Sequence, residues 1–181
     1  HESDFPIATP PPDLPGQMRA FAEFWSALRL TPDSDLSQLM AFAQPCSPGS
    51  AIAVGHLLRR SDVFEVMVRA LRSRDAEWQG AGIAMARAAR PVDPRLPEVL
   101  IDIMNGLSFD PLIDVPGRIV SCGRFEALFV VIADLELATP EMLAALKALQ
   151  RRLVRHDAYL VNRITIVLRE LHGEPPQTPR G

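Results

Sequence analysis

The sequence predicts an all-α fold, and three observations support this prediction. Apolar residues recur at intervals of three and four along most of the chain, which is the period of an amphipathic helix. No segment shows the strict apolar–polar alternation of a half-buried strand. One pattern, two apolar helices joined by a short polar corner, occurs at 63–89 and again at 143–171. In each copy the corner ends in an aspartate, Asp75 or Asp157, and the second helix is expected to begin there.

Three helices are expected before the first copy of this pattern. The first is predicted at 15–30, and its apolar residues at helical spacing are Met18, Phe21, Ala22, Trp25 and Leu28. The second is expected to begin at Thr31-Pro32-Asp33, because proline is well placed in a first helical turn. A break at 45–49 then precedes a third helix at 50–60.

The first copy supplies the fourth and fifth helices. Ser61 or Asp62 is expected to cap the fourth helix, whose predicted inward stripe is Val63, Phe64, Met67, Val68 and Leu71. Asp75 is expected to cap the fifth by accepting exposed backbone N–H groups. That helix contains Gly80, Ala81 and Gly82. A glycine costs a helix about 1 kcal/mol, so we expect these small residues to allow a close approach of backbones.

Four more helices are predicted beyond Pro91 and Pro94. They are a sixth at 96–105, a seventh from about Cys122, an eighth capped by Thr139 with Pro140 in its first turn, and a ninth that begins at Asp157 and ends at Gly173. The segment 106–121 departs from the pattern, because helix connections usually take about 2–8 residues. It is either an ordered loop covering one end of the fold or a specificity element that touches a partner.

The repeated pattern resembles the HEAT-repeat family. The two corner aspartates lie 82 residues apart, about two periods of the ~40–47 residues expected for paired-helix repeats. The resemblance covers 61–173 and, less closely, 15–60. It implies a short right-handed α-solenoid of three to four helix pairs with an N-terminal capping helix. The family often has an arginine where Gln79 and Val161 stand, so its ladder of charges is absent or replaced. The alternative is a generic helical bundle with accidental self-similarity.

The chain is expected to form one domain at 15–173, between a flexible proline-rich segment at 1–14 and a flexible tail at 174–181. The proline-rich start is compatible with a processed exported protein and equally with a trimmed end, so a periplasmic and a cytoplasmic location both stay open. Arginine supplies nearly all the basic residues, which suggests a GC-rich bacterial genome. Cys46 and Cys122 fall in different repeats, and we expect free thiols.

Composition and motifs predict no catalytic, cofactor-binding or metal-binding residue. The net charge of −3 and pI near 5.8 argue against a nucleic-acid-binding protein. The longest clean apolar run, 127–133, is far shorter than the ~20 residues of a membrane span. His56, His156 and His172 have no second ligand at helical spacing, and nucleophile elbows and phosphate-binding loops are absent.

Helical repeats mostly supply a surface for a partner, so we expect a non-catalytic protein–protein interaction module. An inhibitor of the immunity type, bound to a cognate toxin or effector, and an adaptor are the two forms. A nucleic-acid-binding repeat protein and an enzyme with a site invisible in the sequence are the alternatives. The expected partner-binding residues lie on the second helices and in the long segment: Gln79, Arg87, Phe109, Arg118, Glu126, Asn162, Arg163 and Arg169. Phe109 could instead be buried under its own loop.

Overall fold

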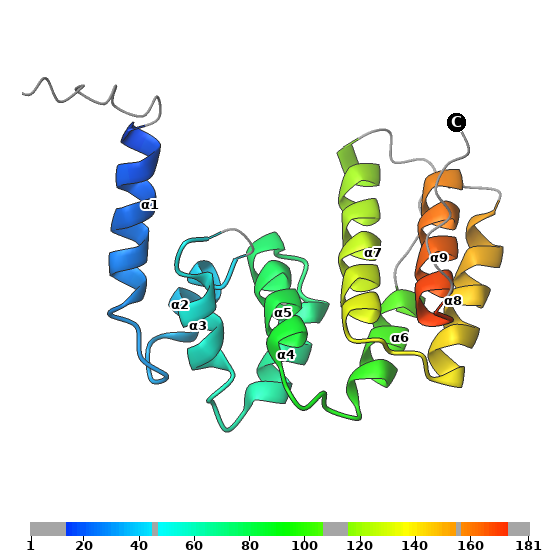
Figure 1. Cartoon of the computed structure of the whole chain (residues 1–181), viewed down its shortest axis with the longest axis horizontal. Coiled ribbons are helices and arrows are strands. Elements are labelled where there is room, and N and C mark those ends of the chain that lie inside the picture. The colour runs from blue at the N-terminus through cyan, green and yellow to red at the C-terminus, as the bar shows by residue number, and fades with distance from the viewer. Residues whose placement is uncertain (1–13, 45–46, 107–115, 155–156, 174–181) are drawn as a thin grey trace, which may run out of the picture.

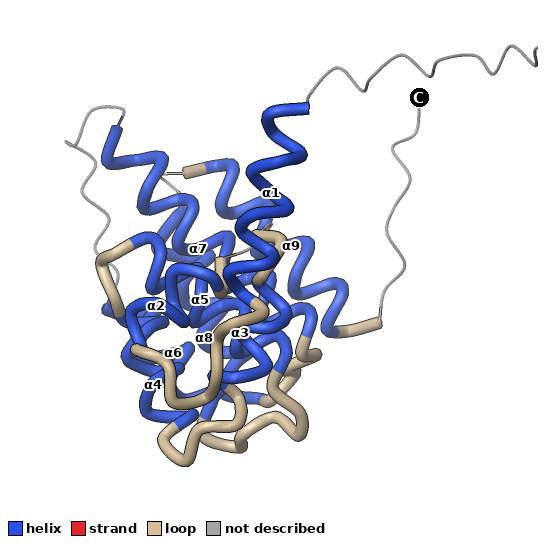
Figure 2. The backbone as a smooth tube through the Cα atoms, turned by 90° about the vertical axis from the view of Figure 1, so that its left-hand side faces the viewer, coloured by secondary structure: helices blue, strands red, loops and turns tan. Residues whose placement is uncertain are grey.

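The computed structural model describes residues 14–44, 47–106, 116–154 and 157–173, together with their side chains except those of 14 and 116–124. This part of the chain contains helices and loops and no strand (Figures 1 and 2), which confirms the all-α prediction. The helices are α1 (Leu14–Ala27), α2 (Leu36–Phe42), α3 (Ser50–Leu57), α4 (Val63–Arg72), α5 (Ala76–Ala88), α6 (Leu96–Gly106), α7 (Pro116–Asp134), α8 (Pro140–Leu153) and α9 (Ala158–Leu171).

The helices pack in two rows. One row is α3, α5, α7 and α9, in which each helix packs against the next, and the other is α4, α6 and α8. Helices that follow one another in the chain, such as α4 and α5 or α8 and α9, pack across the two rows. Figure 1 shows α5, α7 and α9 running in one direction and α4, α6 and α8 in the other. The chain therefore forms successive antiparallel helix pairs, with α1 at one end, where it packs chiefly against α3 among the described helices.

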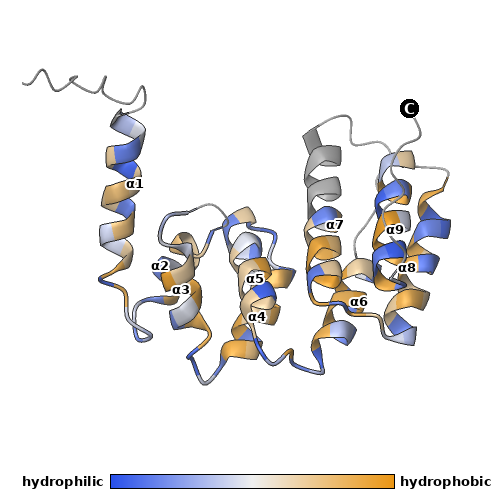
Figure 3. Ribbon diagram, viewed as in Figure 1, coloured by the Kyte–Doolittle hydropathy of each residue, from blue (hydrophilic) through white to orange (hydrophobic). Residues whose placement is uncertain are grey.

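The core is formed by buried apolar residues from both rows. Figure 3, coloured by hydropathy, shows hydrophobic residues along the helices of both rows. Phe125 and Phe129 on α7 are fully buried, and their ring centroids lie 6.1 Å apart. Burying such a side chain stabilises the fold by roughly 1.5–3 kcal/mol. Leu71 on α4, Met85 on α5 and Leu100 on α6 are equally inaccessible to solvent. No described helix is long and apolar enough to cross a membrane.

Side chains cap the second helix of each repeat copy, and also the start of α8, as predicted. Asp75 accepts a hydrogen bond from the backbone N–H of Trp78 at 2.9 Å, and Asp157 accepts one from Leu160 at 3.0 Å. Thr139 likewise accepts from the N–H of Met142 at 3.2 Å. The last helix ends at Leu171, two residues before the expected glycine stop at Gly173, whose positive φ of 70° suits glycine. At these helix ends the local signals therefore give the boundaries to within two residues.

Two helix starts differ from the prediction. α2 begins after Asp35, whose carboxylate accepts from two backbone N–H groups, so the expected start at Thr31-Pro32-Asp33 is wrong. α7 begins at Pro116, earlier than the predicted start near Cys122. Part of the segment 106–121 is therefore helical, since residues 116–121 belong to α7, and residues 107–115 lie outside the described residues.

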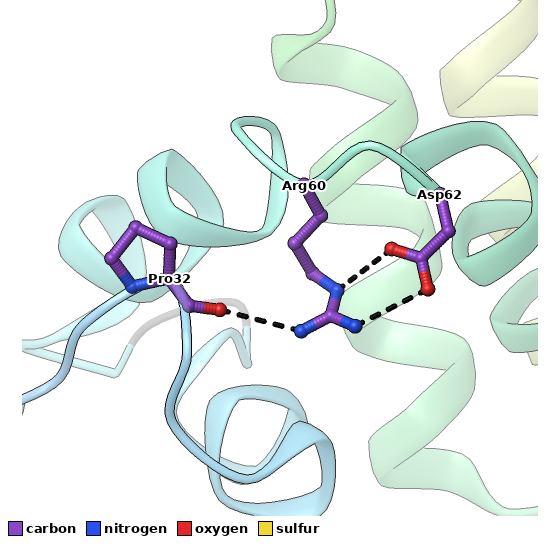
Figure 4. A network of polar contacts seen from close by, with 3 residues as sticks. All are labelled: Pro32, Arg60 and Asp62. Carbon is purple, nitrogen blue, oxygen red and sulfur yellow. Dashed lines mark hydrogen bonds and ion pairs between the residues drawn. The ribbon is translucent and has the colours of Figure 1, made fainter.

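Asp62 precedes α4 but does not cap it with its side chain. Its carboxylate instead accepts hydrogen bonds from Nε and Nη2 of Arg60, at 2.9 and 3.2 Å (Figure 4). The third nitrogen of Arg60 donates to the backbone oxygen of Pro32 at 3.3 Å, so one guanidinium joins the loop before α2 to the corner between α3 and α4. Hydrogen bonding from Arg60 lowers the pKa of Asp62 below its usual value.

The inward stripe predicted for α4 is also shifted. The buried residues are Val66, Met67, Ala70 and Leu71, whereas Val63, Phe64 and Val68 are half-buried. The reason is the position of α5, which approaches α4 over Ala70. A Cβ atom added to Gly82 would lie 2.7 Å from the backbone nitrogen of Leu71 and 2.9 Å from the Cβ of Ala70. The expected close approach of backbones is therefore confirmed at Gly82.

Candidate partner-binding surface

Two carboxylates on α7 lie on the side of the helix that faces away from the core. Glu126 and Asp134 are eight residues apart, slightly more than two helical turns. Phe125, Phe129 and Ile132 are fully buried and lie on the side of α7 that faces the core. Both carboxylates are thus directed toward the outer face of the row formed by α5, α7 and α9, and they reach the two flanking helices.

Asp134 pairs with an arginine of α5. The Nε of Arg87 lies 2.5 Å from Oδ2 of Asp134, and the two side chains are 49% and 40% exposed. At this exposure water screens the attraction, and such pairs are typically worth at most about 1 kcal/mol. The pair therefore links the C-terminal ends of α5 and α7 without contributing much stability.

Glu126 contacts two residues of α9. The hydroxyl of Tyr159 donates a hydrogen bond to Oε1 of Glu126. The Nε of Arg163 lies 3.7 Å from the same oxygen, which is close enough for an ion pair but too long for a hydrogen bond. This Nε is buried and has no hydrogen-bond partner among the described residues. A further hydrogen-bond acceptor, from water or a bound partner, would satisfy this N–H group.

The remaining predicted residues of α5 and α9 lie beside these pairs. Asn162 and Arg169 are exposed and seven residues apart, so they lie on the same side of α9. Gln79 is half-buried, and its Nε2 is buried without a hydrogen-bond partner among the described residues. We call the whole set the polar strip: Gln79, Arg87, Glu126, Asp134, Tyr159, Asn162, Arg163 and Arg169.

The structure brings Glu126 and Arg163 together as one ion pair, and it reveals two members of the strip that the sequence analysis missed. Asp134 and Tyr159 are the contacts that link α7 to its neighbours. The two predicted anchors in the long segment cannot be placed. Phe109 lies outside the described residues, and Arg118 belongs to α7 but its side chain is not described.

A second feature lies at the corner between α4 and α5. An open hollow of about 560 Å³ is lined by Arg69, Arg72, Ser73, Asp75 and Trp78. The guanidinium of Arg69 lies 4.9 Å from the centre of the Trp78 ring, which is within the range of a cation–π contact. Arg72 pairs with Asp102 of α6 at 2.6 Å. Trp78 is half-buried rather than fully buried, because one side of its ring faces this hollow.

Among the described side chains, no group of three or more His, Cys, Asp or Glu is arranged to hold a metal ion. The Nδ1 of His56 on α3 is buried without a hydrogen-bond partner among these residues. The chain was compared with protein-family models, curated proteins and solved structures, and none of the three comparisons found a match.

Proposed function

We propose that this chain is a non-catalytic protein–protein interaction module that binds its partner through the polar strip. The observation that carries the proposal is the continuity of the strip across three parallel helices. Arg87 and Asp134 join α5 to α7, and Glu126, Tyr159 and Arg163 join α7 to α9. A surface of this width, with exposed charges of both signs, suits a protein partner of complementary charge.

The proposed architecture behind this surface is a short right-handed solenoid of HEAT-like helix pairs. The parallel course of α5, α7 and α9 supports it, as do the aspartate caps of α5 and α9. In such solenoids the second helices of the pairs line one extended face, which is the face that partners use. The polar strip lies on these second helices.

The interaction module has two proposed forms, an inhibitor of the immunity type and an adaptor. An inhibitor would abolish the activity of a toxin-like enzyme at a one-to-one ratio, whereas an adaptor would bind without changing the activity of its partner. The experiment is to co-express the chain with the product of a neighbouring reading frame, to co-purify the two, and to titrate the partner's activity. A chain that turns over a substrate by itself, and loses this activity on one substitution, would contradict both forms.

Charge reversal tests whether the polar strip is the binding surface. Arg169→Glu is expected to weaken binding of the co-purified partner at least tenfold, because it replaces attraction by repulsion on an exposed part of the strip. Lys147→Glu makes the same change in charge on an exposed position of α8, in the other row, and should alter affinity less than twofold. Equal effects of the two variants would show that only overall charge matters and that the strip is not the site.

Phe109 remains the predicted hydrophobic anchor of the interface. Phe109→Ala is expected to weaken binding by more than about 2 kcal/mol, as aromatic hot spots do, and to leave the melting temperature nearly unchanged. Isothermal titration and thermal denaturation of the same sample measure both quantities. A sharp fall of the melting temperature with unchanged affinity of the folded protein would instead place Phe109 in the fold.

A further inference from the structure

Helix α1 has an unusual surface. Among the described residues, seven large hydrophobic side chains are exposed. Four of them lie on α1, and a fifth, Leu28, directly follows it and donates its backbone N–H to the oxygen of Phe24 at 3.1 Å. These five are Met18 at 66% exposure, Phe21 at 62%, Phe24 at 39%, Trp25 at 54% and Leu28 at 48%. The sequence analysis identified most of this apolar stripe, but the structure leaves it without a described partner. Contiguous exposed apolar patches of this kind mark interaction sites.

The spacing of the stripe is that of a helix which pairs with another helix. Met18, Phe21, Trp25 and Leu28 follow one another at intervals of three, four and three residues. This is the a/d pattern of a coiled-coil seam, and the period of 3.5 residues keeps the seam directed at a partner helix over successive turns. Phe21 and Trp25 already contact each other edge to face, with ring centroids 5.8 Å apart. The stripe is therefore preorganised for a helical partner.

The side of α1 away from the stripe packs against the rest of the protein, at Ala27. Ala27 is fully buried, and a Cβ atom added to Gly49 would lie 2.3 Å from the Cβ of Ala27, so the two backbones approach closely there. Ala27 follows Trp25 by two residues, which places it about 200° around the helix axis. The last turn of α1 is thus anchored to the array, and most of its length stands clear of the other helices (Figure 1). A second helix can reach the stripe without displacing the anchor.

We propose that the partner of this stripe is α1 of a second copy of the chain, packed antiparallel in a two-fold symmetric dimer. The stripe is symmetric about Glu23: Met18 and Leu28 lie five residues to either side of it, and Phe21 and Trp25 lie two. In an antiparallel pair Met18 therefore faces Leu28 of the second copy, and Phe21 faces Trp25. A two-fold dimer requires such a self-complementary patch, and the antiparallel arrangement also opposes the two helix dipoles favourably.

Charge is consistent with this arrangement. Arg19 and Glu23 follow the stripe positions Met18 and Phe21 by one and two residues, which places them at heptad positions b and f, outside the contact. No like charges are therefore brought together in the seam. The one Arg and one Glu of α1 cancel, whereas helices that lie on anionic membranes carry an excess of Lys and Arg on the polar face. The observations favour a second copy over a lipid surface.

The exposed area sets the strength of this contact. At 150–250 Å² for a complete aromatic side chain, Phe21, Phe24 and Trp25 expose roughly 300 Å². Met18 and Leu28 bring the stripe to on the order of 500 Å², so two copies would bury about 1,000 Å². This is the lower limit for specific interfaces. The dimer is accordingly weak and reversible, and its population depends on protein concentration.

The first experiment measures the oligomeric state of the full chain by sedimentation velocity over a hundredfold range of concentration. The expected result is a monomer–dimer equilibrium. Trp25→Glu, which places two charges in the seam, should raise the dissociation constant at least about thirtyfold. Val154→Glu makes a comparable change at a position that is 63% exposed on the far side of the array, and should leave it unchanged. Circular dichroism of both variants checks that they fold.

The second experiment tests the antiparallel register by disulfide cross-linking. In a chain with Cys46 and Cys122 replaced by serine, Met18→Cys and Leu28→Cys are prepared as separate variants. Mixed and oxidised, they are expected to form a covalent dimer, because facing residues of the pair come within disulfide distance. Each variant alone should form little. Self-linking of each single variant would show parallel pairing and overturn the antiparallel arrangement.

A chain that stays monomeric at all concentrations would overturn the proposal. Two further measurements would then show what covers the stripe instead. If it is monomeric and Trp25→Glu lowers its melting temperature, another part of the same chain covers the stripe. If it is monomeric and sediments with anionic phospholipid vesicles, and Trp25→Glu abolishes this, the stripe binds lipid. The polar strip lies on other helices, so none of these results decides whether it binds a partner.

Discussion

At the scale of single residues, Gly82 sets how closely α4 and α5 approach. Gly82→Ala adds a methyl group 2.7 Å from a backbone nitrogen that is held in a helix. Such overpacking typically costs 1–3 kcal/mol, against a gain of about 1 kcal/mol in helix propensity. We expect a net loss of up to about 2 kcal/mol in the free energy of unfolding, measured by urea denaturation.

Gly55 provides the matched control for this substitution. It also lies inside a helix, α3, but an added Cβ would meet no atom within 4 Å. Gly55→Ala is therefore expected to stabilise the protein by up to about 1 kcal/mol. If both variants were stabilised to the same extent, the backbones of α4 and α5 would have to be farther apart than described.

The ion pair between Arg60 and Asp62 makes stability depend on pH. Hydrogen bonding from Arg60 holds the pKa of Asp62 below its ordinary value of 3.8 in the folded protein. Since this pKa is lower in the folded than in the unfolded state, the stabilisation is present above about pH 4 and is lost as pH falls through the folded-state pKa. Hydrogen bonding from Arg95 lowers the pKa of Asp93 in the same direction.

Asp62→Asn isolates the contribution of one carboxylate. Its unfolding free energy should lie below that of the original chain at pH 7, and the difference should shrink as pH is lowered below about 4. Urea denaturation at a series of pH values measures the difference. A gap that stays constant or widens toward low pH would mean that the pair with Arg60 does not form in solution.

At the scale of helices, α7 contributes two fully buried aromatic side chains, Phe125 and Phe129, to the core. Phe129→Ala removes a fully buried ring and is expected to cost about 3–5 kcal/mol. Trp78 is a larger aromatic residue, but it is only half-buried and borders the open hollow of α4 and α5. We therefore expect Trp78→Ala to cost clearly less than Phe129→Ala in urea denaturation. The reverse order would show that the hollow is closed in solution.

Some features of the helices follow from local sequence and others do not. Asp75, Thr139 and Asp157 cap helices through residues three positions away, so neighbouring residues suffice to predict them. Arg87 and Asp134 are 47 residues apart in the chain, and their pairing depends on the relative position of α5 and α7, which no local pattern contains. The apolar stripe on α1 is a second example of a feature that local sequence predicts only in part. Its spacing predicts that this face of the helix packs against something, but it does not identify the surface that covers it.

At the scale of the whole molecule, stability is expected to differ along the array. Helix α1 packs chiefly against α3 among the described helices, whereas α7 packs against α5, α6 and α9. Amide hydrogens of α1 should therefore exchange with solvent faster than those of α7, because local opening exposes few buried contacts. Hydrogen exchange with mass spectrometry, at a concentration where the chain is monomeric, measures this. Equal protection of the two helices would contradict it.

The pairing of helices that are close in the chain also has a consequence for how fast the protein folds. The substantial packing among the described helices joins elements at most three apart in order, such as α2 with α5 or α7 with α9. Forming these contacts closes only short loops, so little chain entropy is lost before the first stabilising contacts appear. Helical proteins with such local contacts fold in microseconds to milliseconds. An antiparallel pair such as α4 and α5, joined by a corner of three residues that includes a capping aspartate, is a natural starting point from which neighbouring pairs can add in either direction.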